Sequence, residues 1–146
     1  MDQPETQPQA DSPPRSRLTF RREKRLVRDS DFSRVYRTGN RAKGQLMTVA
    51  VMPNGGEVTR LGLSIGKRVW KHAVPRNRVR RMFREAFRLS YPDLPVGVDV
   101  IMIGSVPRVV PSLSATRVEL VRLAGKALRR YEEKLAAQAD SEEATG

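Results

Sequence analysis

A stretch in the middle of the chain concentrates the residue types that recognise phosphate. Between Lys67 and Arg88 there are nine Lys or Arg residues and a single acid, Glu85. An Arg guanidinium binds a phosphate group through two parallel hydrogen bonds, whereas Lys acts as a point charge. Four polar residues of the stretch are spaced four, three and four positions apart, so that a helix would place them along one edge: Asn77, Arg81, Arg84 and Arg88.

Such a helix face has an ordinary interpretation, because many Arg-rich faces are only solvated surface. A solvated face, however, usually interleaves acids with bases so that they pair at i,i+4. Here only Glu85 is available, and its expected partner is Arg81. Mutual repulsion among the remaining cations is best relieved by a bound polyanion. The stretch therefore favours RNA, DNA or an anionic membrane surface as the partner.

The charge of the whole chain agrees with this class of partner and divides the chain into three parts. Its 146 residues carry a net charge of +12, and residues 15–131 alone hold 27 basic and 8 acidic residues. Residues 1–14 hold three acids, no Lys or Arg, and four of the ten prolines, and 132–146 hold five acids and one Lys. These shifts predict a disordered Pro/Gln-rich tail, one folded domain and a flexible acidic tail, over residues 1–16, 17–136 and 137–146.

The composition also removes several classes of chemistry. With no Cys and one His, the chain has no disulfide, no Cys/His zinc site, no Cys nucleophile and no His pair for acid–base catalysis. The longest apolar runs are four residues, far short of the roughly 18 that a membrane span needs. The first residues do not resemble a secretory signal. We therefore expect a cytoplasmic protein that binds no membrane.

The elements that would position the basic stretch follow from periodicity. A first helix is expected to be capped by Asp29 and to end at Gly39, with Phe32, Val35 and Tyr36 on its apolar face. Residues 46–52 and 58–65 predict two strands joined by a Pro- and Gly-rich turn into a hairpin. A second helix over 73–90 accepts Pro75 in its first turn, with five residues directed inward: Val79, Met82, Phe83, Ala86 and Phe87.

Two further elements complete the expected fold. Residues 97–103 are nearly all apolar, which predicts a buried strand. A third helix is expected to start within 112–116, where Thr116 and Glu119 have the spacing of a capping box. The order helix, hairpin, helix, strand, helix predicts an α+β fold, a single-domain two-layer sandwich of helices against a sheet.

The ordered blocks of this sequence resemble the bacterial ribonuclease P protein subunit. The signature blocks are Lys67-Arg68, Ala73, Arg76-Asn77-Arg78, Arg80-Arg81 and Arg84-Glu85-x-Phe87. Upstream, the matching blocks are Phe20, Arg22-Glu23-x-Arg25-Leu26, Asp31-Phe32-x-x-Val35-Tyr36-x-x-Gly39 and Gly62-Leu-Ser-Ile65. The resemblance covers residues 18–135, and agreement over so many ordered blocks is not expected by chance.

The resemblance implies a fold and a function. The fold would be an αβββαβα-like sandwich with a left-handed βαβ crossover, against the general right-handed preference. The function would be that of a non-catalytic subunit of an endoribonuclease, which binds a catalytic RNA and the 5′ leader of precursor tRNA and promotes removal of the leader. Hydrolysis would belong to the RNA subunit, and Mg²⁺ would be held mainly by the RNA subunit and the substrate. No protein partner and no metal-binding motif of the protein are expected.

The resemblance also assigns the binding residues, none of them catalytic. Phe32 and Tyr36 would line a cleft for the single-stranded leader, since aromatic rings stack on bases without demanding sequence. By spacing alone, such a pair is more often part of a core, and only the family resemblance favours the cleft. Relatives often carry a further aromatic residue on the first strand, which 46–52 lacks, so the platform would be thinner here. Contacts to the RNA backbone would come from Arg25, Lys67, Arg68, Lys71, Arg76, Asn77, Arg78, Arg80, Arg81, Arg84 and Arg88.

Several residues keep other interpretations open. Trp70 would either stack on a nucleotide or pack at a strand–helix junction, and His72 would be a residue of the helix start or a further RNA contact. A free-standing nuclease would need metal bound by Asp29, Asp31 or Asp99, although the sequence shows no cluster of carboxylates. The strongest alternative is a general basic RNA-binding or ribosome-associated structural protein, or a DNA-binding module, because the same charge would serve it equally well.

Overall fold

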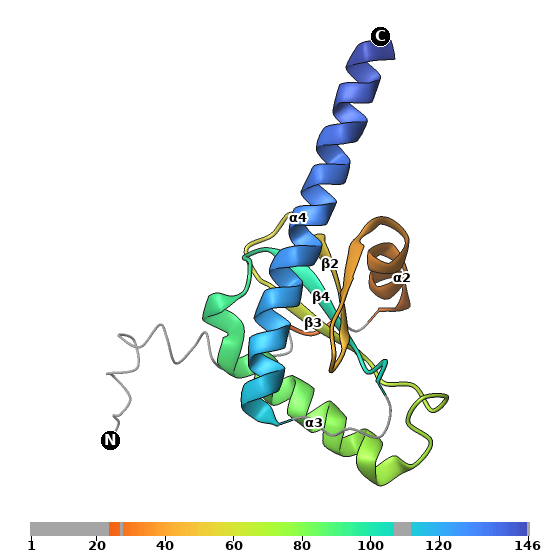
Figure 1. Ribbon diagram of the computed structural model, residues 1–146, viewed down its shortest axis with the longest axis vertical. Coiled ribbons are helices and arrows are strands. Elements are labelled where there is room, and N and C mark those ends of the chain that lie inside the picture. Colours follow the sequence, from red (N-terminus) through yellow and green to blue (C-terminus); the bar gives the residue numbers. More distant parts are fainter. Residues whose placement is uncertain (1–23, 27, 107–111, 146) are drawn as a thin grey trace, which may run out of the picture.

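The structure is a computed structural model that describes residues 24–26, 28–106 and 112–145 (Figure 1). The expected disordered tail, 1–16, and the blocks before residue 24 lie outside these residues. The elements in chain order are α2 (Asp29–Thr38), β1 (Asn40–Lys43), β2 (Thr48–Pro53), β3 (Arg60–Ser64), α3 (Ala73–Ser90), the 3-10 turn η3 (Tyr91–Asp93), β4 (Val98–Ile103) and α4 (Leu113–Thr145).

The four strands form one mixed sheet in the order β1-β2-β4-β3. β4 pairs antiparallel with β2 and parallel with β3, so the predicted hairpin of residues 46–52 and 58–65 is wrong. The physical reason is that β4 is the most apolar strand and is buried along almost its whole length, which suits the centre of a sheet. β3, α3 and β4 therefore form a parallel strand–helix–strand crossover.

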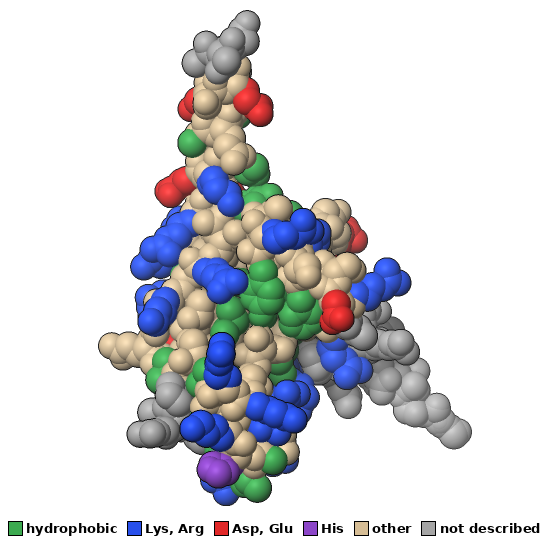
Figure 2. Space-filling model, turned by 90° about the vertical axis from the view of Figure 1, so that its right-hand side faces the viewer, with side chains coloured by type: hydrophobic (Ala, Val, Ile, Leu, Met, Phe, Trp, Pro, Cys, Tyr) green, Lys and Arg blue, Asp and Glu red, His purple; other side chains and the backbone are tan. Residues whose placement is uncertain are grey.

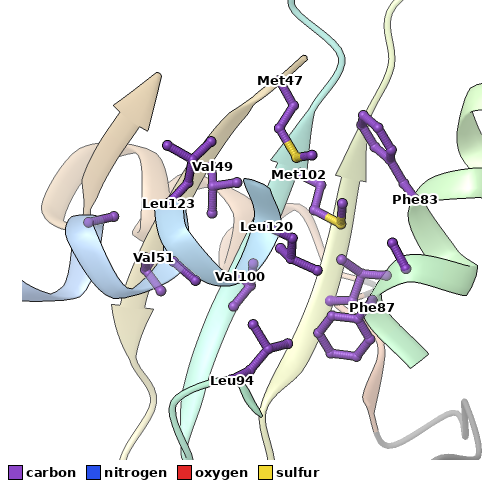
Figure 3. Close-up of a cluster of buried hydrophobic side chains, with 14 of the residues drawn as sticks. Met47, Val49, Val51, Phe83, Phe87, Leu94, Val100, Met102, Leu120 and Leu123 are labelled. Atoms are coloured by element: carbon purple, nitrogen blue, oxygen red, sulfur yellow. The ribbon is translucent and has the colours of Figure 1, made fainter. Parts of the chain in front are cut away.

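Helices cover both faces of the sheet. α3 and α4 pack on one face, and the short α2 lies on the other (Figure 1). Figure 3 shows the main core, in which side chains of α3 and α4 meet those of β2 and β4. The predicted α+β sandwich is confirmed, and α3 has the predicted bounds. Of its five expected inward residues, Met82 is half-buried and four are buried: Val79, Phe83, Ala86 and Phe87.

The ends of two helices differ from expectation. The N-cap of α2 is Arg28, which makes no side-chain cap bond, and not the predicted Asp29. Asp29 lies in the first turn, where its negative charge interacts favourably with the helix dipole. At the start of α4, Ser112 rather than Thr116 caps the helix, because its Oγ accepts the Ala115 N–H at 3.2 Å. α4 then continues as helix through 137–145, the segment expected to be a flexible tail, and projects beyond the sandwich (Figure 1).

Glu119, expected to cap α4, instead ties this helix to the turn between β1 and β2. Its carboxylate accepts the backbone N–H groups of Gln45, Leu46 and Met47 at 3.0, 2.7 and 3.0 Å. Gly44 permits this approach, since a Cβ there would lie 2.5 Å from Glu119 Cδ. The contact fixes β1 and β2 relative to α4.

Replacing Glu119 with Ala should lower the free energy of unfolding by about 2–4 kcal/mol, because three N–H donors in and near the core lose their acceptor. Urea unfolding measures this loss, and Glu132→Ala on the exposed part of α4 is the matched control, expected within about 0.5 kcal/mol of wild type. Equal unfolding midpoints for the two variants would contradict a structural role for the carboxylate.

Candidate nucleic-acid interface

The basic residues of α3 and of the loop before it form a cationic surface on the protein. α3 is fixed by its buried stripe on the β3 side of the sheet, so its other side faces solvent. Beyond Glu85, the segment 67–88 has no acid to neutralise this side. Eight of the predicted RNA-binding residues are exposed there: Lys67, Arg68, Lys71, Asn77, Arg78, Arg80, Arg81 and Arg84.

Two of the predicted contacts on α3 are already engaged within the protein. Arg76 is half-buried, and its Nη1 donates to the carbonyl of Trp70 at 3.1 Å. Arg88 Nη2 donates to Glu85 Oε2 at 2.6 Å, so the expected Glu85–Arg81 pair is wrong. This hydrogen bond is the main cause that lowers the pKa of Glu85. Arg81 is consequently left with no ion pair in the described part of the chain.

The loop between β3 and α3 is held by Trp70. This side chain is 4% exposed and belongs to the main core, so the packing interpretation is confirmed and the stacking interpretation is wrong. Its backbone N–H also donates to the carbonyl of Gly66 at 2.9 Å. His72 is exposed at the N-cap of α3 and makes no side-chain cap bond. Trp70 therefore anchors the loop to the core, and the loop exposes Lys67, Arg68 and Lys71 to solvent.

Arg25 lies apart from α3. It is exposed and forms a single parallel bridge with Leu61 of β3, next to the bond from the Leu26 N–H to the Leu61 carbonyl at 2.8 Å. The segment therefore extends the sheet beyond β3. The predicted RNA contacts accordingly fall in two places, at the β3 edge and on α3 with its loop.

Phe32 and Tyr36 project from α2 onto the second face of the sheet. Both are half-buried and pack against the smaller apolar cluster around Ala50 and Ile101. The Phe32 ring lies directly on β3, because a Cβ on Gly62 would stand 2.8 Å from Phe32 Cζ. Both rings therefore combine a packed side with a partly accessible one. Figure 2 shows this side of the molecule, with hydrophobic side chains near its centre and Lys and Arg around them.

Strand β1 adds two cations that periodicity did not identify. Arg41 is paired in register with Ala50 and Lys43 with Thr48, so both stand on the face that carries α2. Ala42 between them points into the main core. The Arg41 guanidinium lies over the Tyr36 ring, 4.8 Å from its centroid. Only the Arg-Ala-Lys alternation signalled this strand, and a four-residue strand with one apolar residue is too short to recognise.

The buried Asp99 of β4 is held by hydrogen bonds and ion pairs within the fold. Arg60 Nε and Nη2 each donate to its carboxylate at 2.8 Å, and Asn54 Nδ2 donates to it at 2.9 Å. Arg34 of α2 also pairs with it. The hydrogen bond between Arg60 and Asp99 is the main cause that raises the pKa of Arg60. Among the described residues, no three His, Asp or Glu side chains are grouped as metal ligands would be.

Replacing Asp99 with Ala should lower the free energy of unfolding by about 3–5 kcal/mol, because two guanidinium groups at the α2–sheet contact lose their carboxylate. The exposed Asp93 provides the matched control, and Asp93→Ala should change stability by less than about 0.5 kcal/mol. Thermal and urea unfolding measure both variants. A loss no greater than that of the control would show that the buried ion pairs do not hold α2 in place.

Comparisons with known proteins agree on one family. The model of the family described as Ribonuclease P matches residues 20–132. The ribonuclease P protein component of Clostridioides difficile is 37% identical over 90 residues, which span 61% of this chain and 78% of that protein. The corresponding protein of Chloroflexus aggregans is 37% identical over 105 residues, spanning 71% and 77%.

Solved structures give the same result for the fold. The RNase P protein from Thermotoga maritima superposes with a TM-score of 0.60 at 26% identity, covering 70% of this chain and 96% of that one. The Staphylococcus aureus RNase P protein superposes with a TM-score of 0.53 at 25% identity, covering 73% and 93%. Within the described residues, none of the helices has the length and apolar character to cross a membrane.

Proposed function

The chain belongs to the ribonuclease P protein family, and from that premise we propose that it is the RNA-binding cofactor with which a catalytic RNA removes the 5′ leader from precursor tRNA. Its family makes it a component of ribonuclease P, a tRNA-processing endoribonuclease. The finer assignment gives the hydrolysis to the RNA subunit and gives the protein two binding tasks. The observation that carries it is the exposed cationic surface of α3 and its loop, formed by Lys67, Arg68, Lys71, Arg78, Arg80, Arg81 and Arg84.

Binding of the RNA subunit is assigned to that surface. Its arginines are exposed on a helix whose opposite side is locked into the core, so they keep their relative positions without help from a ligand. Because Glu85 is taken by Arg88, the exposed guanidinium groups of α3 have no acidic partner in the part of the chain that the structure describes. A folded RNA offers phosphates at close spacing, and neutralising them releases counterions, which drives association. Binding should therefore weaken as salt concentration rises.

Binding of the leader is assigned to the partly accessible faces of Phe32 and Tyr36, which we propose as the leader cleft. A single-stranded leader has unstacked bases, which partly accessible aromatic rings accept whatever their sequence. Arg41 beside Tyr36 supplies a charge for the backbone of the same strand. These two rings are the only Phe, Tyr or Trp in that apolar cluster, among the residues described, which supports the expectation of a thin platform. Leaders of varied sequence are thus accommodated.

Magnesium enters the proposal through the RNA and the substrate. Both are polyanions, and bringing them together requires cations to screen their phosphates. A protein that contacts both contributes fixed positive charge at the junction, so less Mg²⁺ is needed for the same association. The chain's own part in the reaction is therefore to bind and to orient.

The competing assignment is a general basic RNA-binding protein, and a competition experiment separates the two. The protein's affinity for RNase P RNA is measured against an unrelated structured RNA of equal length and against duplex DNA, at about physiological salt. We expect a preference for RNase P RNA of roughly 100-fold or more, as specific complexes exceed non-specific ones by larger factors still. Equal affinity for all three would favour the general binding protein.

A further inference from the structure

A second cationic surface lies away from α3, along the free edge of β1. On α4, four cations recur at every fourth position and therefore form one stripe, from Arg122 to Lys134. Arg130 and Lys134 of this stripe donate to backbone carbonyls at β1 and at the residue that ends α2, and Lys126 precedes Arg130 by one turn on the same stripe. β1 itself carries two exposed cations. We call the following five residues the β1-edge surface: Arg41, Lys43, Lys126, Arg130 and Lys134.

Hydrogen bonds hold α4 against this edge. Arg130 Nη1 donates to the carbonyl of Arg41 at 3.0 Å, and Lys134 Nζ donates to the carbonyl of Thr38 at 3.5 Å. Among the described residues β1 is the outermost strand, so an outward carbonyl has no neighbouring strand there to bond with. α4 thus brings cations from the end of the chain beside those of β1, nearly ninety residues earlier in the sequence.

The β1-edge surface has no acid of its own. Within the part of the chain that the structure describes, none of its five residues forms an ion pair with Asp or Glu. By contrast, Arg34, Arg60 and Arg88 each have a carboxylate partner. Five cations gathered from two elements without a carboxylate repel one another, and a bound polyanion relieves that repulsion.

The location of this surface indicates which polyanion fits. Arg41 and Lys43 stand on the sheet face that carries α2, and Arg41 covers the Tyr36 ring, so the surface begins where the aromatic cleft ends. At the other side of the cleft, Phe32 rests on Gly62 of β3, the strand that leads to α3 and its loop. Phe32 and Tyr36 therefore lie between two cationic surfaces at opposite edges of the sheet.

We propose that the β1-edge surface binds the phosphates of leader nucleotides upstream of those held in the cleft, and so extends the leader path from Tyr36 along β1 to α4. The proposal rests on the proposed function of the cleft. The ligand is single-stranded RNA because the surface continues a stacking platform, and recognition is independent of sequence because these side chains reach phosphates and not base edges.

The test uses the reconstituted holoenzyme and precursor tRNAs with leaders of about 4 and about 12 nucleotides, lengths that bracket typical single-strand site sizes. The test variant is Lys43→Gln with Lys126→Gln, because neither side chain makes a hydrogen bond in the described structure and the fold should be kept. The matched control, Arg80→Gln with Arg84→Gln, removes the same charge from α3. Dissociation constants are measured for both substrates over a range of salt.

The wild-type holoenzyme should bind the long leader more tightly than the short one. The Lys43/Lys126 variant should lose about 5–10-fold in affinity for the long leader alone, and its log–log salt slope should become shallower by about 1.4, which corresponds to two single-strand phosphates. The Arg80/Arg84 control should keep the wild-type ratio between the dissociation constants of the short-leader and long-leader substrates. An unchanged variant, an equal loss for both leaders, or a wild type with no gain from the longer leader would each overturn the proposal.

Failure of the cleft itself gives a different result. If the wild-type holoenzyme does not distinguish the short-leader precursor from mature tRNA, the proposed function of Phe32 and Tyr36 is wrong. The other outcome is that the wild-type holoenzyme does prefer the short-leader precursor over mature tRNA, but the Lys43/Lys126 variant keeps the extra affinity for the long leader. In that case only the β1-edge surface is wrongly assigned.

Discussion

Replacing Arg80, Arg81 and Arg84 together with Gln should weaken binding of the RNase P RNA by roughly 100-fold or more at physiological salt. Each side chain is exposed on α3 and has no carboxylate partner in the described chain, so each is available for a phosphate. Three lost contacts should make the log–log salt slope shallower by about 2.7 for duplex-like RNA. Filter binding or fluorescence anisotropy over a range of salt measures both quantities, and Arg81→Ala alone should change the slope by about 0.9.

Arg88→Gln is the internal control on the same helix. It removes an equal charge, but one whose guanidinium already pairs with Glu85 at 2.6 Å. Its affinity should therefore fall less than that of any single exposed arginine variant. If Arg88→Gln and Arg81→Gln weakened binding equally, or if the triple variant kept its salt slope, α3 would not be the surface that binds RNA.

Replacing Phe32 and Tyr36 should remove the preference of the holoenzyme for precursor tRNA over mature tRNA. Stacking contributes about 1–3 kcal/mol per base, so the loss of two rings should lower precursor affinity by roughly 30-fold or more and leave mature tRNA affinity unchanged. Both rings also pack on the sheet, and truncation to Ala would cost stability as well. Phe32→Leu with Tyr36→Leu is therefore the informative variant, because Leu fills the space but cannot stack.

Two measurements make this result decisive. Urea unfolding establishes that the Leu variant is folded, and binding of mature tRNA establishes that its RNA surface is intact. A folded Leu variant that still prefers precursor tRNA would show that the two rings belong only to the core, the role that their i,i+4 spacing also suggests.

The sequence predicted α3 to the residue because its signals are local. Pro75 fits only the first turn, and the apolar positions from Val79 to Phe87 recur with helical spacing over more than two turns. The basic surface followed directly, since residues of a helix that are not in the buried stripe must face solvent. The central strand, Val98–Ile103, was recognised for the same reason, as its composition alone requires burial.

The errors concern partners that are distant in the sequence. Nothing local to residues 46–65 indicates that β4 separates the two strands, so adjacency in sequence suggested a hairpin that does not exist. Glu119 has the spacing of a capping box but meets backbone N–H groups more than seventy residues earlier. Glu85 had two arginines within helical reach, and the choice of Arg88 over Arg81 depends on side-chain geometry.

The parts of the site that were missed share one cause. Arg41 and Lys43 belong to the four-residue strand β1, which exists because β2 and α4 hold it in place. The acidic composition after residue 136 suggested a tail, yet the segment through 145 has good helix formers and continues α4. Both signals are weak locally and are decided by neighbouring elements, which a single sequence does not reveal.

Single-turnover cleavage of a precursor tRNA at low, about physiological Mg²⁺ tests the cofactor role most directly. Three reactions are compared: the RNase P RNA alone, the same RNA with this protein, and the protein alone. We predict that leader removal is accelerated only when RNA and protein are combined, and that the advantage shrinks as Mg²⁺ is raised, since more Mg²⁺ then screens the phosphates. Cleavage by the protein alone, or no acceleration of the RNA by the protein at low Mg²⁺, would contradict it.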